Sequence, residues 1–152
     1  MPSAAEQAFV ALAGEGRVYE VLGTTTTLVA GHHDTGQRCE VIQSVFPPQG
    51  GLPRHVHNRA DEALYVVDGA VEAEVGQRTA TARAGSFIFI PRGTVHAFHN
   101  ASAQPCTLLV TYLPKLGEGI EAFLNEASQL PPGPPDMAVL LPILERHDLA
   151  PR

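Results

Sequence analysis

The sequence is poor in the residues that mark several large classes of protein. Its 152 residues include no tryptophan and only two cysteines, Cys39 and Cys106, which stand far apart and outside any CxxC pair. This usage favours two reduced, buried thiols in a cytosolic protein over a disulfide framework. No run of residues is long and apolar enough to span a membrane, so we expect no membrane association.

Positive charge is also scarce. The chain has 10 Lys and Arg against 16 Asp and Glu, a net charge of −6, and its basic residues form no cluster. This balance argues against a nucleic-acid partner. Residues 1–6 contain no basic segment followed by an apolar run, so no signal peptide is visible and we expect a cytoplasmic location.

Short strand-like runs dominate the middle of the chain. Between Arg17 and Tyr112, runs rich in Val, Ile, Thr and Phe alternate with Gly, Pro, Asn and Asp at spacings of roughly 8 to 12 residues. This texture predicts an all-β sandwich or barrel. The clearest expected strands span residues 24–30, 38–46, 62–67, 70–75, 78–83, 87–90, 95–100 and 106–112.

Both ends of the chain have sequence patterns that are typical of helices. A capping-box pattern predicts a short N-terminal helix over about residues 4–13, and helical periodicity predicts a C-terminal helical tail over about 117–149. A chain of this length is large enough for one hydrophobic core. We therefore expect a single domain over residues 1–152, with its barrel core at about 17–113.

The first of two histidine motifs combines two imidazoles with a carboxylate. It reads His55-Val56-His57 and is followed, across a short turn, by Glu62. Side chains at positions i and i+2 of a strand point to the same face, so His55 and His57 are expected to point together. The strand face that carries Glu62 is otherwise apolar, which suits the interior of a barrel.

The second motif supplies a third imidazole. It runs from Pro91-Arg92-Gly93 through His96 to Asn100. On a strand in this region, His96 and Asn100 share one face and His99 lies on the opposite face. We therefore place His96 in the predicted site and leave His99 out.

Three imidazoles and one carboxylate form a plausible ligand set for one divalent transition metal. Such donors suit iron, manganese, nickel, copper or zinc, and the sequence does not choose among them. Four protein ligands leave one or two positions open on a five- or six-coordinate ion. Structural zinc sites, in contrast, are usually closed and rich in thiolates, and neither motif contains a cysteine.

These two segments resemble the two motifs of the cupin family. The first fits the family pattern from His55 through Gly69, although Gln49 stands where the family usually has a glycine. The whole chain is most similar to small single-domain cupins of the quercetin-dioxygenase-like kind. The second segment fits the pattern at each fixed position, namely Gly85, Pro91, Gly93, His96 and Asn100.

The resemblance implies a double-stranded β-helix, the cupin or jelly-roll barrel, of six to eight strands with a metal at its centre. It also implies that the chain forms a homodimer. Family spacing allows Asp61 as a rival carboxylate, but the six-residue gap to Gly69 selects Glu62. The ligands carried over from the family are His55, His57, Glu62 and His96.

The resemblance and the open metal positions lead to a hypothesis about function. We expect a metal-dependent oxidoreductase, similar to a dioxygenase, that acts on a small apolar substrate with an enolisable or phenolic group, with Glu62 as catalytic base. The alternatives are a metal-dependent cyclase or isomerase, and a non-catalytic module that binds a small molecule. Three arginines near the motifs, Arg54, Arg59 and Arg92, are interpreted as charges on the rim of the site.

Overall fold

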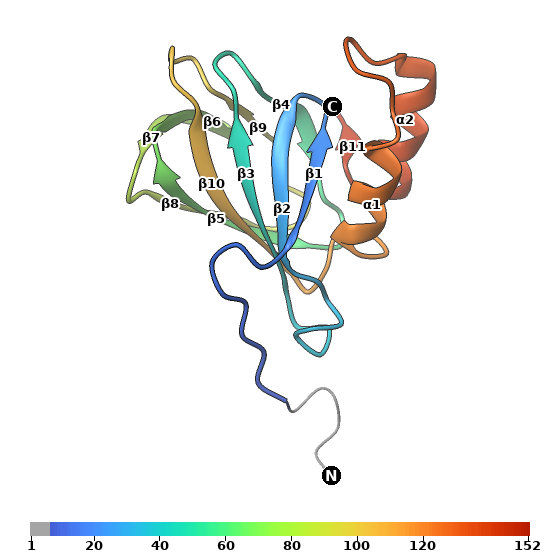
Figure 1. The fold of residues 1–152 in the computed structure, drawn as a ribbon. Helices are drawn as coiled ribbons and strands as arrows, with labels where there is room; N and C mark the ends of the chain where they lie inside the picture. The colour runs from blue at the N-terminus through green and yellow to red at the C-terminus, as the bar shows by residue number, and fades with distance from the viewer. Residues whose placement is uncertain (1–6) are drawn as a thin grey trace.

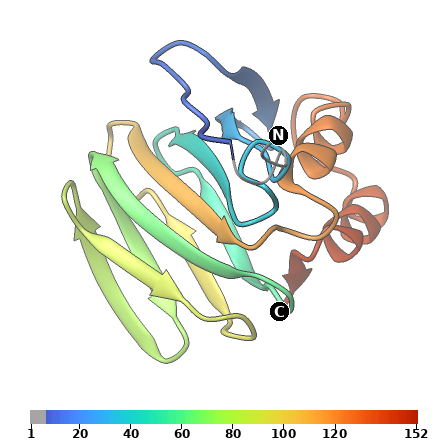
Figure 2. The ribbon, with the colours of Figure 1, turned by 90° about the horizontal axis from the view of Figure 1, so that it is seen from below.

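The computed structural model describes residues 7–152, in which eleven strands form two facing antiparallel sheets (Figures 1 and 2). The six-stranded sheet has the order β1-β2-β3-β10-β5-β8, and the five-stranded sheet has the order β11-β4-β9-β6-β7. The strands are β1 (Arg17–Val21), β2 (Thr24–Ala30), β3 (Glu40–Phe46), β4 (Gly51–Val56), β5 (Asp61–Asp68), β6 (Ala70–Val75), β7 (Arg78–Arg83), β8 (Phe87–Ile90), β9 (His96–His99), β10 (Cys106–Leu113) and β11 (Ala150–Pro151).

The core lies between the two sheets. Buried and less buried residues alternate along β2, β3 and β10, as expected for strands with one face on a core. Leu64, Val66 and Leu108 from one sheet and Phe98 from the other are buried in the same cluster. This is the jelly-roll architecture that the sequence predicted, although it has more strands than the six to eight expected.

Two helices cover one side of the sandwich. α1 (Ile120–Ala127) and α2 (Met137–Arg146) lie together beside β1, on the side away from β7 and β8 (Figure 1). The carboxylate of Glu40 on β3 is fully buried and accepts the backbone N–H groups of Leu116, at 2.8 Å, and Ile120, at 2.9 Å. This ties the first turn of α1 to the sheet. Neither helix in the described part of the chain is long and apolar enough to cross a membrane.

The helix expected over residues 4–13 is wrong where the structure can test it. Residues 7–13 contain no helix, and residues 4–6 lie outside the described part of the chain. Phe9, Val10 and Leu12, the apolar residues of the expected helix, are exposed. A helix this short gains its stability from burying one face, and the exposure of these residues shows that the segment buries little of its apolar surface within the described residues.

Candidate metal centre

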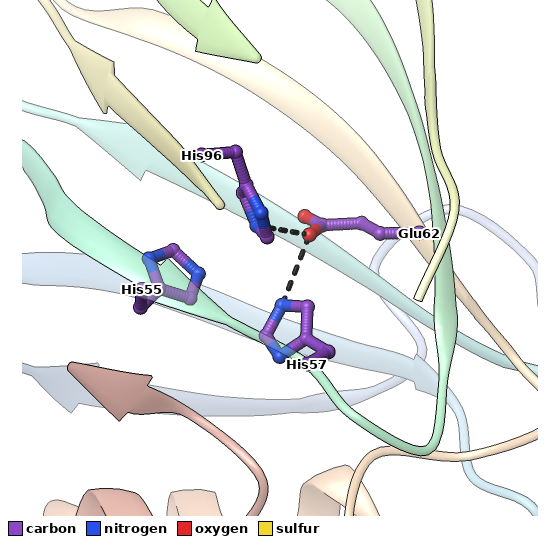
Figure 3. Close-up of side chains that lie close together, drawn as sticks. All are labelled: His55, His57, Glu62 and His96. Carbon is purple, nitrogen blue, oxygen red and sulfur yellow. Dashed lines mark hydrogen bonds and ion pairs between the residues drawn. The ribbon is translucent and has the colours of Figure 1, made fainter. Parts of the chain in front are cut away.

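The structure brings the four residues predicted as metal ligands together inside the sandwich. His55 lies at the end of β4, His57 directly after it, Glu62 on β5 and His96 on β9 (Figure 3). All four side chains are buried, and one nitrogen or oxygen atom from each lies within 4.8 Å of the others. His55 and His96 are direct cross-strand partners, so pairing between β4 and β9 sets their separation.

Hydrogen bonds hold the three imidazoles in one tautomer. A carbonyl oxygen can only accept a hydrogen bond, so each Nδ1 that contacts one must carry a proton. When a ring is neutral, its Nε2 then carries the free lone pair that binds a metal. The three bonds run from Nδ1 of His55 to the carbonyl of Pro53 (2.7 Å), of His57 to Asp148 (2.6 Å) and of His96 to Thr94 (2.9 Å).

The Nε2 atoms converge on the Glu62 carboxylate. Glu62 Oε2 lies 3.0 Å from Nε2 of His57 and 2.9 Å from Nε2 of His96 (Figure 3). The His96 Nε2 atom is fully buried and makes no hydrogen bond of acceptable geometry with the described residues. A buried polar atom without a partner is costly, and a cation bound among these atoms would satisfy it. The cluster therefore fits a divalent transition metal held by three imidazoles and a carboxylate.

The same environment shifts the pKa values of the cluster. Burial, with the nearby charges of His96 and His57, lowers the pKa of His55 to about 4, so this ring is neutral at pH 7. Burial alone would raise the pKa of Glu62, but the hydrogen bond with His57 and the close contact with the His96 ring outweigh it and hold that pKa well below its usual range. Burial also opposes the charged form of His57, yet its hydrogen bond with Glu62 raises the pKa of this ring.

Metal binding is therefore expected to release a proton near neutral pH. Because the pKa of His57 is raised, this ring stays protonated on Nε2 to a higher pH than an ordinary histidine, and a metal must displace that proton to reach Nε2. The apparent affinity should rise with pH until the pH passes this pKa. Calorimetric zinc titrations in buffers of different ionisation enthalpy should show release of about one proton per ion. An affinity that does not change between pH 6 and pH 8 would contradict this expectation.

The C-terminal residues support the centre from outside. The carboxylate of Asp148 accepts backbone N–H groups of Asn58, at 2.7 Å, and Arg59, at 3.0 Å, in the turn after His57. The carbonyl of Asp148 accepts the Nδ1–H of His57, and β11 pairs with β4 alongside His55. This segment, which the sequence analysis missed, therefore fixes both the turn and the orientation of a candidate ligand.

Replacing Asp148 with alanine is expected to destabilise the protein and weaken metal binding. The change removes the acceptors of two backbone N–H groups, at roughly 0.5–1.5 kcal/mol for each hydrogen bond lost, and places alanine at a φ of +62°. Asp148→Asn, which keeps one acceptor oxygen and tolerates this φ, should lose less. Thermal unfolding with and without zinc measures both effects. Equal melting temperatures and equal zinc affinities for Asp148→Ala and wild type would show that the contact is dispensable.

The residues left out of the predicted site lie elsewhere. The rival carboxylate, Asp61, points away from the cluster and forms a two-pronged ion pair with Arg92, at 3.0 and 3.1 Å. His99 is exposed on the opposite face of β9, 3.5 Å from Glu72. Strand parity thus separates His96 from His99 as expected, and Glu62 is the carboxylate that joins the three histidines.

The arginines near the motifs are all paired with carboxylates. Arg54 contacts Glu74, at 2.5 Å, and Arg59 lies 3.7 Å from Glu118. With Arg92 engaged by Asp61, none of the three belongs to the metal cluster. They are surface charges, as their interpretation as rim residues predicted.

Comparison with known proteins agrees with this fold and site. The family model described as a cupin domain matches residues 43–112, a stretch that includes all four clustered residues. A solved RmlC-like cupin from Shewanella frigidimarina superposes with a TM-score of 0.59 at 16% identity, over 72% of this chain and 92% of that one. Residues 43–112 are therefore similar to a cupin domain, and the described residues adopt the jelly-roll fold of cupins.

Two further proteins are similar over different extents. A putative germin-like protein 9-2 from Oryza sativa subsp. japonica is 34% identical over 82 residues, which cover 51% of this chain and 38% of that protein. The chain thus spans well under half the length of this curated relative. The polyketide cyclase RemF from Streptomyces resistomycificus superposes with a TM-score of 0.64 at 20% identity, over 93% of this chain and 99% of that one.

Proposed function

We propose that the protein is a metal-dependent enzyme that acts on a small organic substrate with an enolisable or phenolic oxygen, in the manner of a dioxygenase. The observation that carries the proposal is the buried cluster of His55, His57, Glu62 and His96. Four protein ligands without a thiolate leave coordination positions for a substrate on a five- or six-coordinate ion, unlike the closed sites of structural zinc. Bound there, the ion would supply a Lewis acid for the substrate oxygen and, when redox-active, a partner for dioxygen.

The residues around the ion would hold the site in place, accept a proton and exclude water. The three imidazoles are held by backbone carbonyls and do not need to reorient, which pre-organises the site. Glu62 is the one carboxylate in the cluster, and it is the natural acceptor for the proton that an enol or phenol must lose. Phe98 and Tyr112, both buried nearby, exclude water from this part of the core.

The test is a measurement of oxygen uptake with the purified protein and a panel of flavonols, diketones and catechols. Uptake with at least one compound, lost after chelation and restored by iron, manganese, nickel or copper, is the expected result. Consumption of no compound, with or without oxygen, would contradict catalysis and favour a module that only binds a small molecule.

A second candidate is a metal-dependent cyclase or isomerase. The likeness to the polyketide cyclase RemF supports it because that superposition covers 93% of this chain and 99% of that one. The same panel, with a poly-β-ketone added, separates the two candidates. A cyclase converts a poly-β-ketone without taking up oxygen, whereas a dioxygenase consumes one molecule of oxygen for each molecule of substrate.

A further inference from the structure

A cavity of about 370 Å³ opens between β6 and β7 on one side and β8 on the other. It lies on the side of the sandwich away from α1 and α2 (Figure 1). Small apolar residues of β6 and β7 contribute to its lining, together with Ile88 of β8, and no carboxylate lines it. The small apolar residues that β6 and β7 contribute are Ala73, Val75, Ala80 and Ala82.

The inner wall of this cavity adjoins the metal centre. Val75 is the direct cross-strand partner of His96, so the two side chains stand next to each other on the inner face of the sheet. Ile88 lies two residues before Ile90, which is the cross-strand partner of Glu62. On each sheet, a single side chain therefore stands between the cavity and the candidate metal ligands.

Arg78 is the one charged residue that lines this cavity. It pairs with Val75, which places His55, His96, Val75 and Arg78 in one cross-strand row. Neighbouring strands lie about 4.8 Å apart, so the Cα atoms of Arg78 and His96 are separated by roughly 10 Å. Arg78 shares the inner face of β7 with the buried Ala82, because the two lie four positions apart along the strand and alternate residues point to the same face.

The Arg78 guanidinium also lacks a partner. Arg54, Arg59 and Arg92 each contact a carboxylate, whereas the Arg78 side chain makes no hydrogen bond or ion pair within the described residues 7–152. An unpaired guanidinium at the mouth of an apolar cavity is suited to a planar anion, which it can bind with two parallel hydrogen bonds.

We propose that this cavity binds an amphiphilic organic anion. Its apolar body packs against Val75 and Ile88, and its carboxylate, or a similar planar anionic group, contacts the Arg78 guanidinium. If the enzyme function proposed above holds, this anion is the substrate, and its far end reaches the metal past Val75. Arg78 is then the residue that selects acids over neutral compounds of the same shape.

The test compares two probes of nearly equal shape, the anion 2-naphthoate and the neutral 2-naphthamide. Their affinities are measured by calorimetry on the full-chain protein as purified and again after chelation, so that binding to the metal is separated from binding to Arg78. The wild type should prefer the carboxylate by about tenfold or more, the scale of a charge-assisted hydrogen bond. Arg78→Gln should remove this preference and leave the affinity for the amide within about twofold.

Arg83 provides a matched control. It lies on the same strand as Arg78 but on the opposite face, is exposed, and its side chain makes no hydrogen bond or ion pair within the described residues. Arg83→Gln should keep the wild-type preference, as should Arg78→Lys in part. Three results would each overturn the proposal. The wild type could bind the two probes with equal affinity, Arg78→Gln and Arg83→Gln could behave alike, or neither probe could bind at millimolar concentration. A protein that keeps the preference but converts no substrate would refute the proposed catalysis and leave this inference intact.

Discussion

Replacing His96 with alanine is expected to lower metal affinity by a hundredfold or more. Loss of an outer hydrogen-bond partner of a metal ligand typically costs 10–100-fold, and loss of a ligand removes a direct bond. His96 is the ligand whose Nε2 has no adequate partner within the described residues, and its removal leaves two imidazoles and Glu62. Metal content after extensive dialysis, together with competition against a chromogenic chelator, measures the change.

The neighbouring histidine provides the control for this experiment. His99 lies three residues later on the outer face of β9 and is exposed, so His99→Ala should keep the metal content and affinity of the wild type. Similar losses in both variants would mean that His96 acts through the stability of β9 rather than through a metal. Full retention of metal in His96→Ala would remove this residue from the ligand set.

The second large effect is expected at Glu62. Glu62→Gln keeps the size of the side chain but removes its charge and its ability to accept a proton. Once the oxygen-uptake screen has identified a substrate, turnover should fall by roughly a hundredfold or more, the usual scale for loss of a general base. Metal should be retained in part, because three imidazoles remain. Steady-state rates normalised to bound metal separate the two effects.

The adjacent acid is the matched control for Glu62. Asp61 precedes it on β5, faces outward and pairs with Arg92, so Asp61→Asn should leave turnover and metal content close to wild type. If turnover per bound metal in Glu62→Gln equals that of the wild type, Glu62 is not the base. If only ligand affinity changes and no chemical step is detected in either protein, the chain is a binding module.

Local sequence signals were sufficient to predict most of the strands and the four clustered residues. The expected strands at 24–30, 70–75, 78–83 and 87–90 match β2, β6, β7 and β8, because each is a short β-branched or alternating run that ends at a turn. Parity along a strand, which is a local property, grouped His55 with His57 and separated His96 from His99, and the resemblance to the cupin family supplied Glu62. Those four residues meet as predicted because parity directs all of them into one interior.

The departure from the family pattern at Gln49 has a backbone explanation. Gln49 adopts a φ of +64°, in the left-handed region that favours glycine. Its backbone N–H donates to the carbonyl of Asn100 at 2.7 Å. This hydrogen bond joins the loop before the first motif to the last residue of the second motif. The conformation that glycine usually supplies at this position is thus preserved by glutamine, at a modest cost in strain.

What the sequence did not predict depends on contacts between distant residues. The Asp148 contacts join segments about 90 residues apart, and β11 is only two residues long, so neither leaves a periodic signal. Arg78 begins a strand of alternating polar and small residues, and its place beside the metal centre follows only from the pairing of β7, β6 and β9. The N-terminal segment is the reverse case: its local pattern predicted a helix, but residues 7–13 form none, and Phe9, Val10 and Leu12 remain exposed.

The most direct test of the account is anomalous diffraction at metal absorption edges, from crystals of protein purified without added metal. We predict one peak per chain, about 2.0–2.2 Å from Nε2 of His55, His57 and His96 and from a carboxylate oxygen of Glu62. The edge at which the peak appears would identify the ion. Crystals with no peak among these four residues, even after soaking in iron, manganese, nickel, copper and zinc salts, would contradict the account.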